Sequence, residues 1–419
     1  MKKIINMLFN LQRFATTTSG DIPEDFKVFY NKKLLENANP ALVHEQFAQV
    51  SPIPKGEGKQ IKWRRYAKLP KATTALTEGV TPSGSKLSMS DVTATIAQYG
   101  DFVTLTDIIE WSAIDNNVAQ ASEICGQQMG ETLDTICREV MNSGTAKIIA
   151  PSISGGSVTP VTLRTNITPN CKLTSDVIKQ AVRVLKANDA KKIDGDYVAI
   201  IHPDVAYDLM NDSAWKSANE YAGSKNIFNG EIGKLAGVRF IETTEAKVWG
   251  PPEITQGYTR LTVKTAISSS TGSITVNEIL DAESSKSYAV YINGVANTVT
   301  AIANNTTYST LTLGTNVSSV PAGAVICGKA TSAADEGGKD GSCVYSTLVL
   351  GANAYGKANL AAGNAGIIVK QRGSAGTADP LDQRATVGWK ADAAYKILND
   401  AFMVRIESAS TYSGETKAN

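Results

Sequence analysis

The chain has 419 residues, of which 42% are hydrophobic and 19% charged, and its 41 Lys and Arg almost balance its 40 Asp and Glu, for a net charge of +1. This composition excludes a disordered chain and a protein that is basic over its whole surface. Five Cys with no C-x-x-C pair exclude a disulfide scaffold and fit a reducing compartment. No apolar stretch reaches the ~20 residues of a membrane span. Only two His leave little material for zinc sites or His-based catalysis.

Residues 1–60 are predicted to form an N-terminal arm. The first 18 residues begin with two Lys and an apolar run, as a signal peptide does, but polar residues interrupt the run and Phe14–Ala15 makes a poor cleavage site. The apolar residues of this stretch recur at helical spacing. We therefore expect a short amphipathic arm that packs on a partner or frays.

Residues 61–107 are predicted to form an extended loop of two strands with a loose tip. Residues 61–71 are strand-like, residues 76–87 are rich in turn formers, and residues 92–107 alternate apolar and polar side chains. Between Lys55 and Lys71 there are seven Lys or Arg and one Glu, so the start of this loop is locally basic.

A long helix is predicted over residues 116–143. Asp115 is a plausible N-cap, apolar residues recur at spacings of three and four, and Gly144 is expected to end the helix in a left-handed conformation. A helix of this length is typical of a structural spine.

Residues 175–252 are predicted to be the first part of an α/β domain. A helix at 175–187 precedes a buried strand at 197–201, and Pro203 fits the first turn of a second helix.

Residues 253–338 are predicted to form an inserted all-β domain. The segment is poor in charge, has no helical period and contains several short strands, with Asn293–Gly294 as a hairpin turn. The strand spacing suits a small β-sandwich-like or barrel domain. Residues 339–419 then complete the host domain with strands at 346–356, 366–371 and 402–408, which places residues 249 and 345 near each other.

The motifs for chemistry are weak. Gly323 to Lys329 matches G-x-x-x-x-G-K, but Ala330 replaces the magnesium-binding Ser or Thr, so a glycine-bounded strand is favoured. His202, before Pro203, is interpreted as a structural residue at a strand end. No catalytic, cofactor-binding or metal site is predicted.

The basic run has two interpretations. Its interleaved aromatic residues resemble a surface that binds single-stranded nucleic acid, but the balanced net charge favours a strand pair that contacts another subunit. The candidate subunit-contact residues are Lys62, Trp63, Arg64, Arg65, Tyr66, Lys68, Thr77 and Glu78.

Taken in chain order, several motifs resemble those of tailed-phage major capsid proteins, and more narrowly the coat proteins of large-genome, short-tailed coliphages. They are RRYAKLPKATTALTEGVTP, HPD after the buried strand, GEIGKLAGVRFIETTEAKV, STLVLGANAYG and DPLDQRATVGWKADAAYKILND. The resemblance runs from about residue 20 to 252 and from 341 to 408, and it does not cover the insertion.

The resemblance implies an α+β chain with the Hong Kong 97-type phage coat fold, which has an N-arm, an extended β loop, a long spine helix, and peripheral and axial domains. It also implies self-assembly of hexamers and pentamers into an icosahedral shell around double-stranded DNA, in a virion assembled in the bacterial cytoplasm. A scaffolding protein, a portal and a decoration protein are the expected partners, with no membrane and no cofactor. The insertion is expected to project as surface decoration.

Two other classes of function stay open on the sequence. One is an exported or tail-associated adhesin whose β domain binds host-surface glycans, and it requires a functional export signal and small oligomers. The other is an enzyme, which requires a site that the motifs do not supply.

Overall fold

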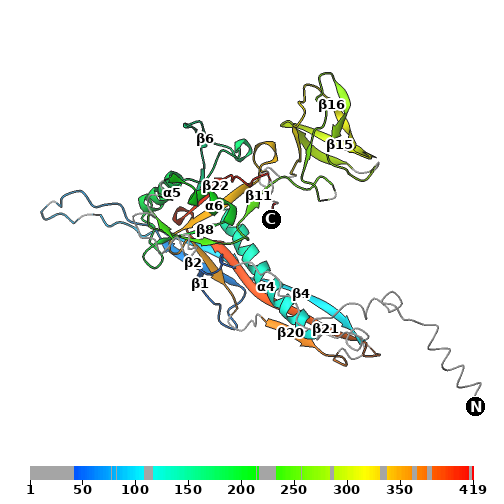
Figure 1. The fold of residues 1–419 in the computed structure, drawn as a ribbon. Coiled ribbons are helices and arrows are strands. Elements are labelled where there is room, and N and C mark those ends of the chain that lie inside the picture. Colours follow the sequence, from blue (N-terminus) through cyan, green and yellow to red (C-terminus); the bar gives the residue numbers. More distant parts are fainter. Residues whose placement is uncertain are drawn as a thin grey trace, which may run out of the picture.

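The structure is a computed structural model that describes residues 42–76, 78–81, 83–107, 117–213, 215–216, 233–255, 257–283, 287–330, 337–360, 366–374, 380–414 and 418–419. The predicted arm therefore lies outside the described residues as far as residue 41. Figure 1 shows an elongated molecule with a long helix, a projecting hairpin and a separate β unit.

The centre of the molecule is a seven-stranded mixed sheet. Its order is β5-β22-β18-β8-β10-β9, and β11 also pairs with β18. The strands are β5 (Lys147–Ile149), β8 (Tyr197–Ile201), β9 (Lys234–Leu235), β10 (Val238–Glu242), β11 (Val248–Trp249), β18 (Val344–Leu350) and β22 (Met403–Ser408).

Helices cover both faces of this sheet. The helices α5 (Ser175–Ala187) and α6 (Pro203–Met210) bury their apolar side chains against one face, and the sequence prediction for α5 is confirmed to the residue. The C-terminal half of α4 (Asn117–Asn142) packs on the other face, where Met141 meets Ile200 and Leu348. At 1.5 Å per residue, the 26 residues of α4 span about 39 Å.

The prediction that the long helix ends with Gly144 in a left-handed conformation is wrong. Gly144 is not among the residues with positive φ. Glycine is favoured at position 144 because two side chains approach its Cα closely. A Cβ there would lie 2.8 Å from Oδ1 of Asp400 and 3.0 Å from the Met403 side chain. Asp400 also accepts a hydrogen bond from the backbone N–H of Thr145 at 3.1 Å, so a distant loop fixes the end of α4.

The N-terminal half of α4 lies along a second sheet (Figure 1). The long strand β21 (Arg384–Ile397) pairs with β4 (Ala97–Thr106) on one side, and with β20 (Gly366–Lys370) and β19 (Tyr355–Ala358) on the other, and β1 (Gln49–Val50) adds to β19. Trp389 and Val387 of β21 face the helix and pack on Cys125.

Two smaller hairpins project from the body. β2 (Gln60–Tyr66) pairs with β3 (Met89–Thr95), and β6 (Ser152–Ser154) pairs with β7 (Ser157–Thr159). The strand predicted at 92–107 is divided at Ile96, because β4 leaves the first hairpin and joins β21. Short 3-10 turns lie at Arg164–Asn166, Lys339–Gly341 and Asp400–Phe402.

The insertion forms its own six-stranded antiparallel sheet, in the order β12-β17-β14-β15-β16-β13, around its own hydrophobic core. The strands are β12 (Arg260–Thr262), β13 (Thr271–Val276), β14 (Tyr288–Ile292), β15 (Val295–Asn305), β16 (Tyr308–Val317) and β17 (Val325–Gly328). A bridge between Val263 and Val276 closes the sheet. We call this unit the barrel, and the rest of the described chain the host.

Candidate subunit-contact surface

The base of the β2–β3 hairpin is fixed within the chain by Trp63. The indole N–H donates a hydrogen bond to Oγ of Ser51 at 3.1 Å. Its ring lies so close to Gly356 that a Cβ there would be 3.0 Å away. Trp63 therefore anchors the hairpin on β19, together with a small cluster around Ile53 and Ala358.

Most side chains of β2 on either side of Trp63 face solvent. Lys62, Arg64, Arg65 and Tyr66 are exposed, and Arg64 stands opposite Asp91 in the strand pair. Figure 1 shows the hairpin extending well away from the rest of the host. The candidate contact residues on β2 thus share one projecting element, with Trp63 at its root.

The rest of the candidate contact residues lie toward the hairpin tip. Nζ of Lys68 lies 3.4 Å from Oδ2 of Asp189, with both side chains more than 80% exposed, so this ion pair contributes at most ~1 kcal/mol. Glu78 is exposed, and Thr77 lies outside the described residues. Of the basic run 55–71, only Lys68 forms an ion pair within the described part of the chain.

Large apolar side chains are exposed along the same hairpin. Six of them are between 46% and 77% exposed: Tyr66, Leu69, Leu76, Val80, Leu87 and Met89. A two-stranded hairpin is marginally stable alone, and the described residues leave these apolar side chains largely open to solvent. The sequence prediction overlooked five of the six, because they lie in or beside a turn-rich stretch with no periodic pattern.

A second open surface lies on the sheet face opposite α4. Phe102 of β4 is 67% exposed and Ile368 of β20 is 48% exposed, on either side of Gly388. Lys370 and Lys390 flank them and line a recess of about 450 Å³. This face combines an apolar centre with positive charge, and the described residues leave it uncovered.

The residues considered for chemistry have structural roles. Nδ1 of His44 lies 2.6 Å from Oδ2 of Asp134 in the core. The His202 ring accepts a hydrogen bond from the backbone N–H of Asp204 at 3.2 Å and caps α6, and burial lowers its pKa. Lys329 follows β17, so the G-x-x-x-x-G-K match is a strand as predicted.

Other site classes find no support in the described part of the chain. It contains no group of three or more His, Cys, Asp or Glu suited to a metal ion. The five Cys are buried and form no disulfide. No described helix combines the length and the apolar character needed to span a membrane.

Comparison with known proteins supports the resemblance found in the sequence. Residues 90–259 match the phage capsid protein family. The fold matches the capsid of cyanophage P-SCSP1u at 13% identity and a TM-score of 0.54, over 95% of this chain and 93% of that one. It also matches the capsids of cyanophage Pam1 (11%, TM-score 0.53) and Helicobacter pylori bacteriophage KHP30 (10%, TM-score 0.53), each over 94% of this chain and 99% of that one. No curated protein sequence matches the chain.

These matches agree with the long helix, the projecting hairpin and the two sheets of the host, and together they define the fold. The chain has the Hong Kong 97-type coat fold, as the sequence predicted. Its resemblance to tailed-phage major capsid proteins is confirmed. The narrower likeness to large-genome, short-tailed coliphages stays a prediction.

Proposed function

We propose that this chain is the major capsid protein of a tailed bacteriophage, with a structural and not a catalytic role, and that it assembles into the icosahedral head shell around double-stranded DNA. The observation that carries the proposal is the projecting hairpin, whose apolar side chains have no cover within the described part of one chain. A second copy supplies that cover. Symmetry then repeats one modest contact many times, which stabilises a closed shell.

The parts of the chain take the roles that the coat fold implies. Residues 1–60 are the arm and residues 61–107 the extended loop, and the β2–β3 hairpin begins at the boundary between them and ends at Thr95. Residues 108–174 contain the spine helix of the peripheral domain, residues 175–252 begin the axial domain, and residues 339–419 complete both. The barrel within 253–338 projects as surface decoration, which is consistent with its separation from the host in Figure 1.

The open face of β4, β21 and β20 is the surface that we expect to receive the hairpin of a neighbour. Phe102 and Ile368 offer apolar contact to the leucines of the hairpin tip. Burying such half-exposed side chains contributes about 1–2 kcal/mol each, which suits reversible assembly of hexamers and pentamers. DNA contact inside the shell is electrostatic and independent of sequence.

Partners complete the proposed assembly. A scaffolding protein sets the shell size, a portal occupies one vertex and a decoration protein binds the outer surface. Assembly takes place in the bacterial cytoplasm and the product is the virion capsid.

A pair of charge substitutions tests the hairpin contact. We expect Leu76→Asp with Leu87→Asp to abolish sedimenting assemblies while the monomer keeps its melting temperature, because both side chains lie in solvent in the isolated chain. Val295→Asp is the matched control, since Val295 is 63% exposed on the barrel. Normal shells from the hairpin variant would contradict the proposal.

A further inference from the structure

The barrel and the host do not share a hydrophobic core. The apolar cluster inside the barrel contains only barrel residues, and the cluster beneath β18 contains only host residues. Between them lies a cavity of about 430 Å³, lined by Tyr291 of the barrel and by Asn166 and Lys339 of the host, among others. Apolar packing therefore does not fix the angle between the two units.

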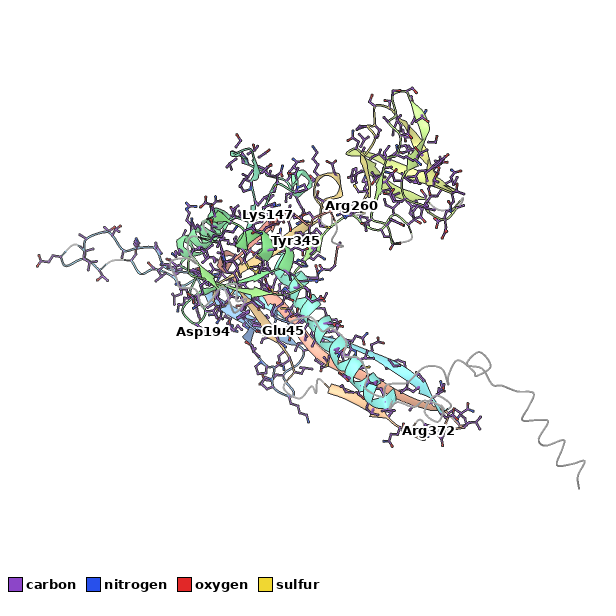
Figure 2. The ribbon with its side chains drawn as sticks, in the orientation of Figure 1. Glu45, Lys147, Asp194, Arg260, Tyr345 and Arg372 are labelled. Atoms are coloured by element: carbon purple, nitrogen blue, oxygen red, sulfur yellow. The ribbon has the colours of Figure 1, made fainter. Side chains whose placement is uncertain are left out.

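Arg260 crosses this junction. It belongs to β12 of the barrel and lies at the junction with the host (Figure 2), which its guanidinium reaches through hydrogen bonds. Nε donates to the carbonyl of Gly341 at 2.8 Å, Nη2 donates to the carbonyl of Ser413 at 2.9 Å, and Nη1 donates to the carbonyl of Gly414 at 2.5 Å. Three backbone acceptors thus form a socket that fits one planar guanidinium.

The C-terminal residues also hold both chain segments that lead into the barrel. The Ser413 carbonyl accepts the backbone N–H of Cys343 at 2.8 Å, at the return strand. The Asn419 side chain accepts the backbone N–H of Val248 at 2.9 Å and donates to the carbonyl of Ala246 at 3.0 Å, at the outgoing strand.

Close backbone contacts support the same geometry. Gly341 has φ +73°, and a Cβ there would lie 2.7 Å from Cβ of Cys327 on β17. A Cβ at Gly328 would lie 2.1 Å from the Pro252 carbonyl oxygen. The glycines allow the barrel to sit directly on its two linkers.

We propose that Arg260 and the C-terminal residues 413–414 and 418–419 form a clasp that locks the barrel in one orientation on the host. In this clasp the C-terminal residues bind the Arg260 guanidinium of the barrel and backbone groups of both linkers. Without it, the barrel would pivot about Pro251 and Pro252. Identical orientation in every copy would let a shell present its barrels as a regular array, and this last consequence alone rests on the proposed function.

The test measures the orientation of the barrel in the unassembled full-length chain. Spin labels at Val295→Cys on the barrel and Val158→Cys on the host report one distance distribution, because both sites are 63% exposed while the native Cys are buried. We expect Arg260→Gln to broaden this distribution about twofold or more. Hydrogen exchange at the Cys343 amide should accelerate by about tenfold, as expected from the loss of bonds made by a charged group.

Two further variants separate the clasp from stability of the barrel itself. Asn419→Ala should broaden the distribution in the same direction. Lys264→Gln should leave it unchanged, because the Lys264 side chain contacts Thr307 and Tyr308, which both belong to the barrel. An unchanged distribution in Arg260→Gln, or faster exchange confined to the barrel interior, would overturn the proposal whether or not the chain forms shells.

Discussion

Trp249 and Val344 are paired on adjacent antiparallel strands, although the whole barrel lies between them in the sequence. The host sheet therefore continues across the point of insertion. The Arg164 guanidinium lies 3.7 Å from the centre of the Trp249 ring, and Arg405 lies on the same ring at 5.5 Å. The entrance to the barrel is thus one of the more strongly anchored parts of the host.

This pairing predicts that the barrel can be removed. Replacing residues 253–338 with a short Gly-Ser linker should leave the host folded, because the two strand ends are already neighbours. We expect similar far-ultraviolet circular dichroism per host residue and a small drop in melting temperature, since the contacts of Arg260 are lost. Deletion of the seven residues of β18 serves as the control and should prevent folding. An insoluble barrel-deleted chain would show that the host depends on the insertion.

The buried contact between His44 and Asp134 is expected to contribute strongly to stability. The Asp134 carboxylate receives the His44 backbone N–H at 2.9 Å as well as the ring contact, and both side chains are almost completely buried. His44→Ala leaves a buried carboxylate short of a partner, which should lower the free energy of unfolding by about 3 kcal/mol. Urea denaturation measures the loss, and Gln46→Ala, on the same segment but exposed, should change it little.

The ion network around Glu407 predicts loss of stability in acid. Burial raises the pKa of Glu407, but the hydrogen bond and charge of Arg164 and the charge of Arg405 outweigh it and hold the pKa below its usual value. A carboxyl group whose pKa is lower in the folded state than in the unfolded state stabilises the folded protein. For Glu407 this stabilisation is fully present above the pKa of an unfolded Glu, about 4.3. It is lost as the pH falls through the lower pKa of the folded state.

Unfolding of Glu407→Gln at pH 7 and below pH 4 checks this sign. The variant should be less stable at pH 7 by about 3 kcal/mol, because Arg164 and Arg405 lose a buried partner. Its stability should then fall less steeply in acid than that of the parent chain. Equal acid slopes for the two proteins would rule out this role, and Asp176→Asn, from an exposed pair with Lys179, is the control.

Gly388 is expected to tolerate no side chain. A Cβ at this position would lie 2.7 Å from Cβ of Phe102 and 2.8 Å from the carbonyl oxygen of Asp101. Gly388→Ala should separate β4 from β21 and cost about 1–3 kcal/mol. Gly314→Ala is the matched control in a strand, because its nearest neighbour would be 3.5 Å away, and equal melting temperatures for the two variants would refute the steric argument.

Local patterns in the sequence predicted the regular elements well. The apolar spacing of α5 and the turn signal at Asn293–Gly294 depend on residues a few positions apart, and both are confirmed. The expected proximity of residues 249 and 345 is also confirmed, since it followed from the chain entering and leaving one domain.

Features that depend on distant partners were missed. The strand at 92–107 gave no sign of its division at Ile96, because the division arises from pairing with β21. Gly144 was interpreted as a helix end, whereas the approach of Asp400 explains it. The pairing of His44 with Asp134 joins residues 90 positions apart and has no local signal.

The candidate surface was predicted in part. The charged and aromatic residues of β2 were identified from their spacing, and the structure assigns Trp63 to the root of the hairpin. The exposed leucines at the tip carry the stronger argument for a subunit contact, but an isolated leucine in a loop looks the same in a sequence whether it is buried or exposed.

Electron cryomicroscopy of the full-length chain, expressed together with its neighbouring phage genes, tests the central claim most directly. The account predicts closed polyhedral shells in which the hairpin tip around Leu76 and Leu87 is buried on the sheet of an adjacent copy that carries Phe102. Only monomers or small oligomers under these conditions, or shells whose hairpins remain in solvent, would contradict it.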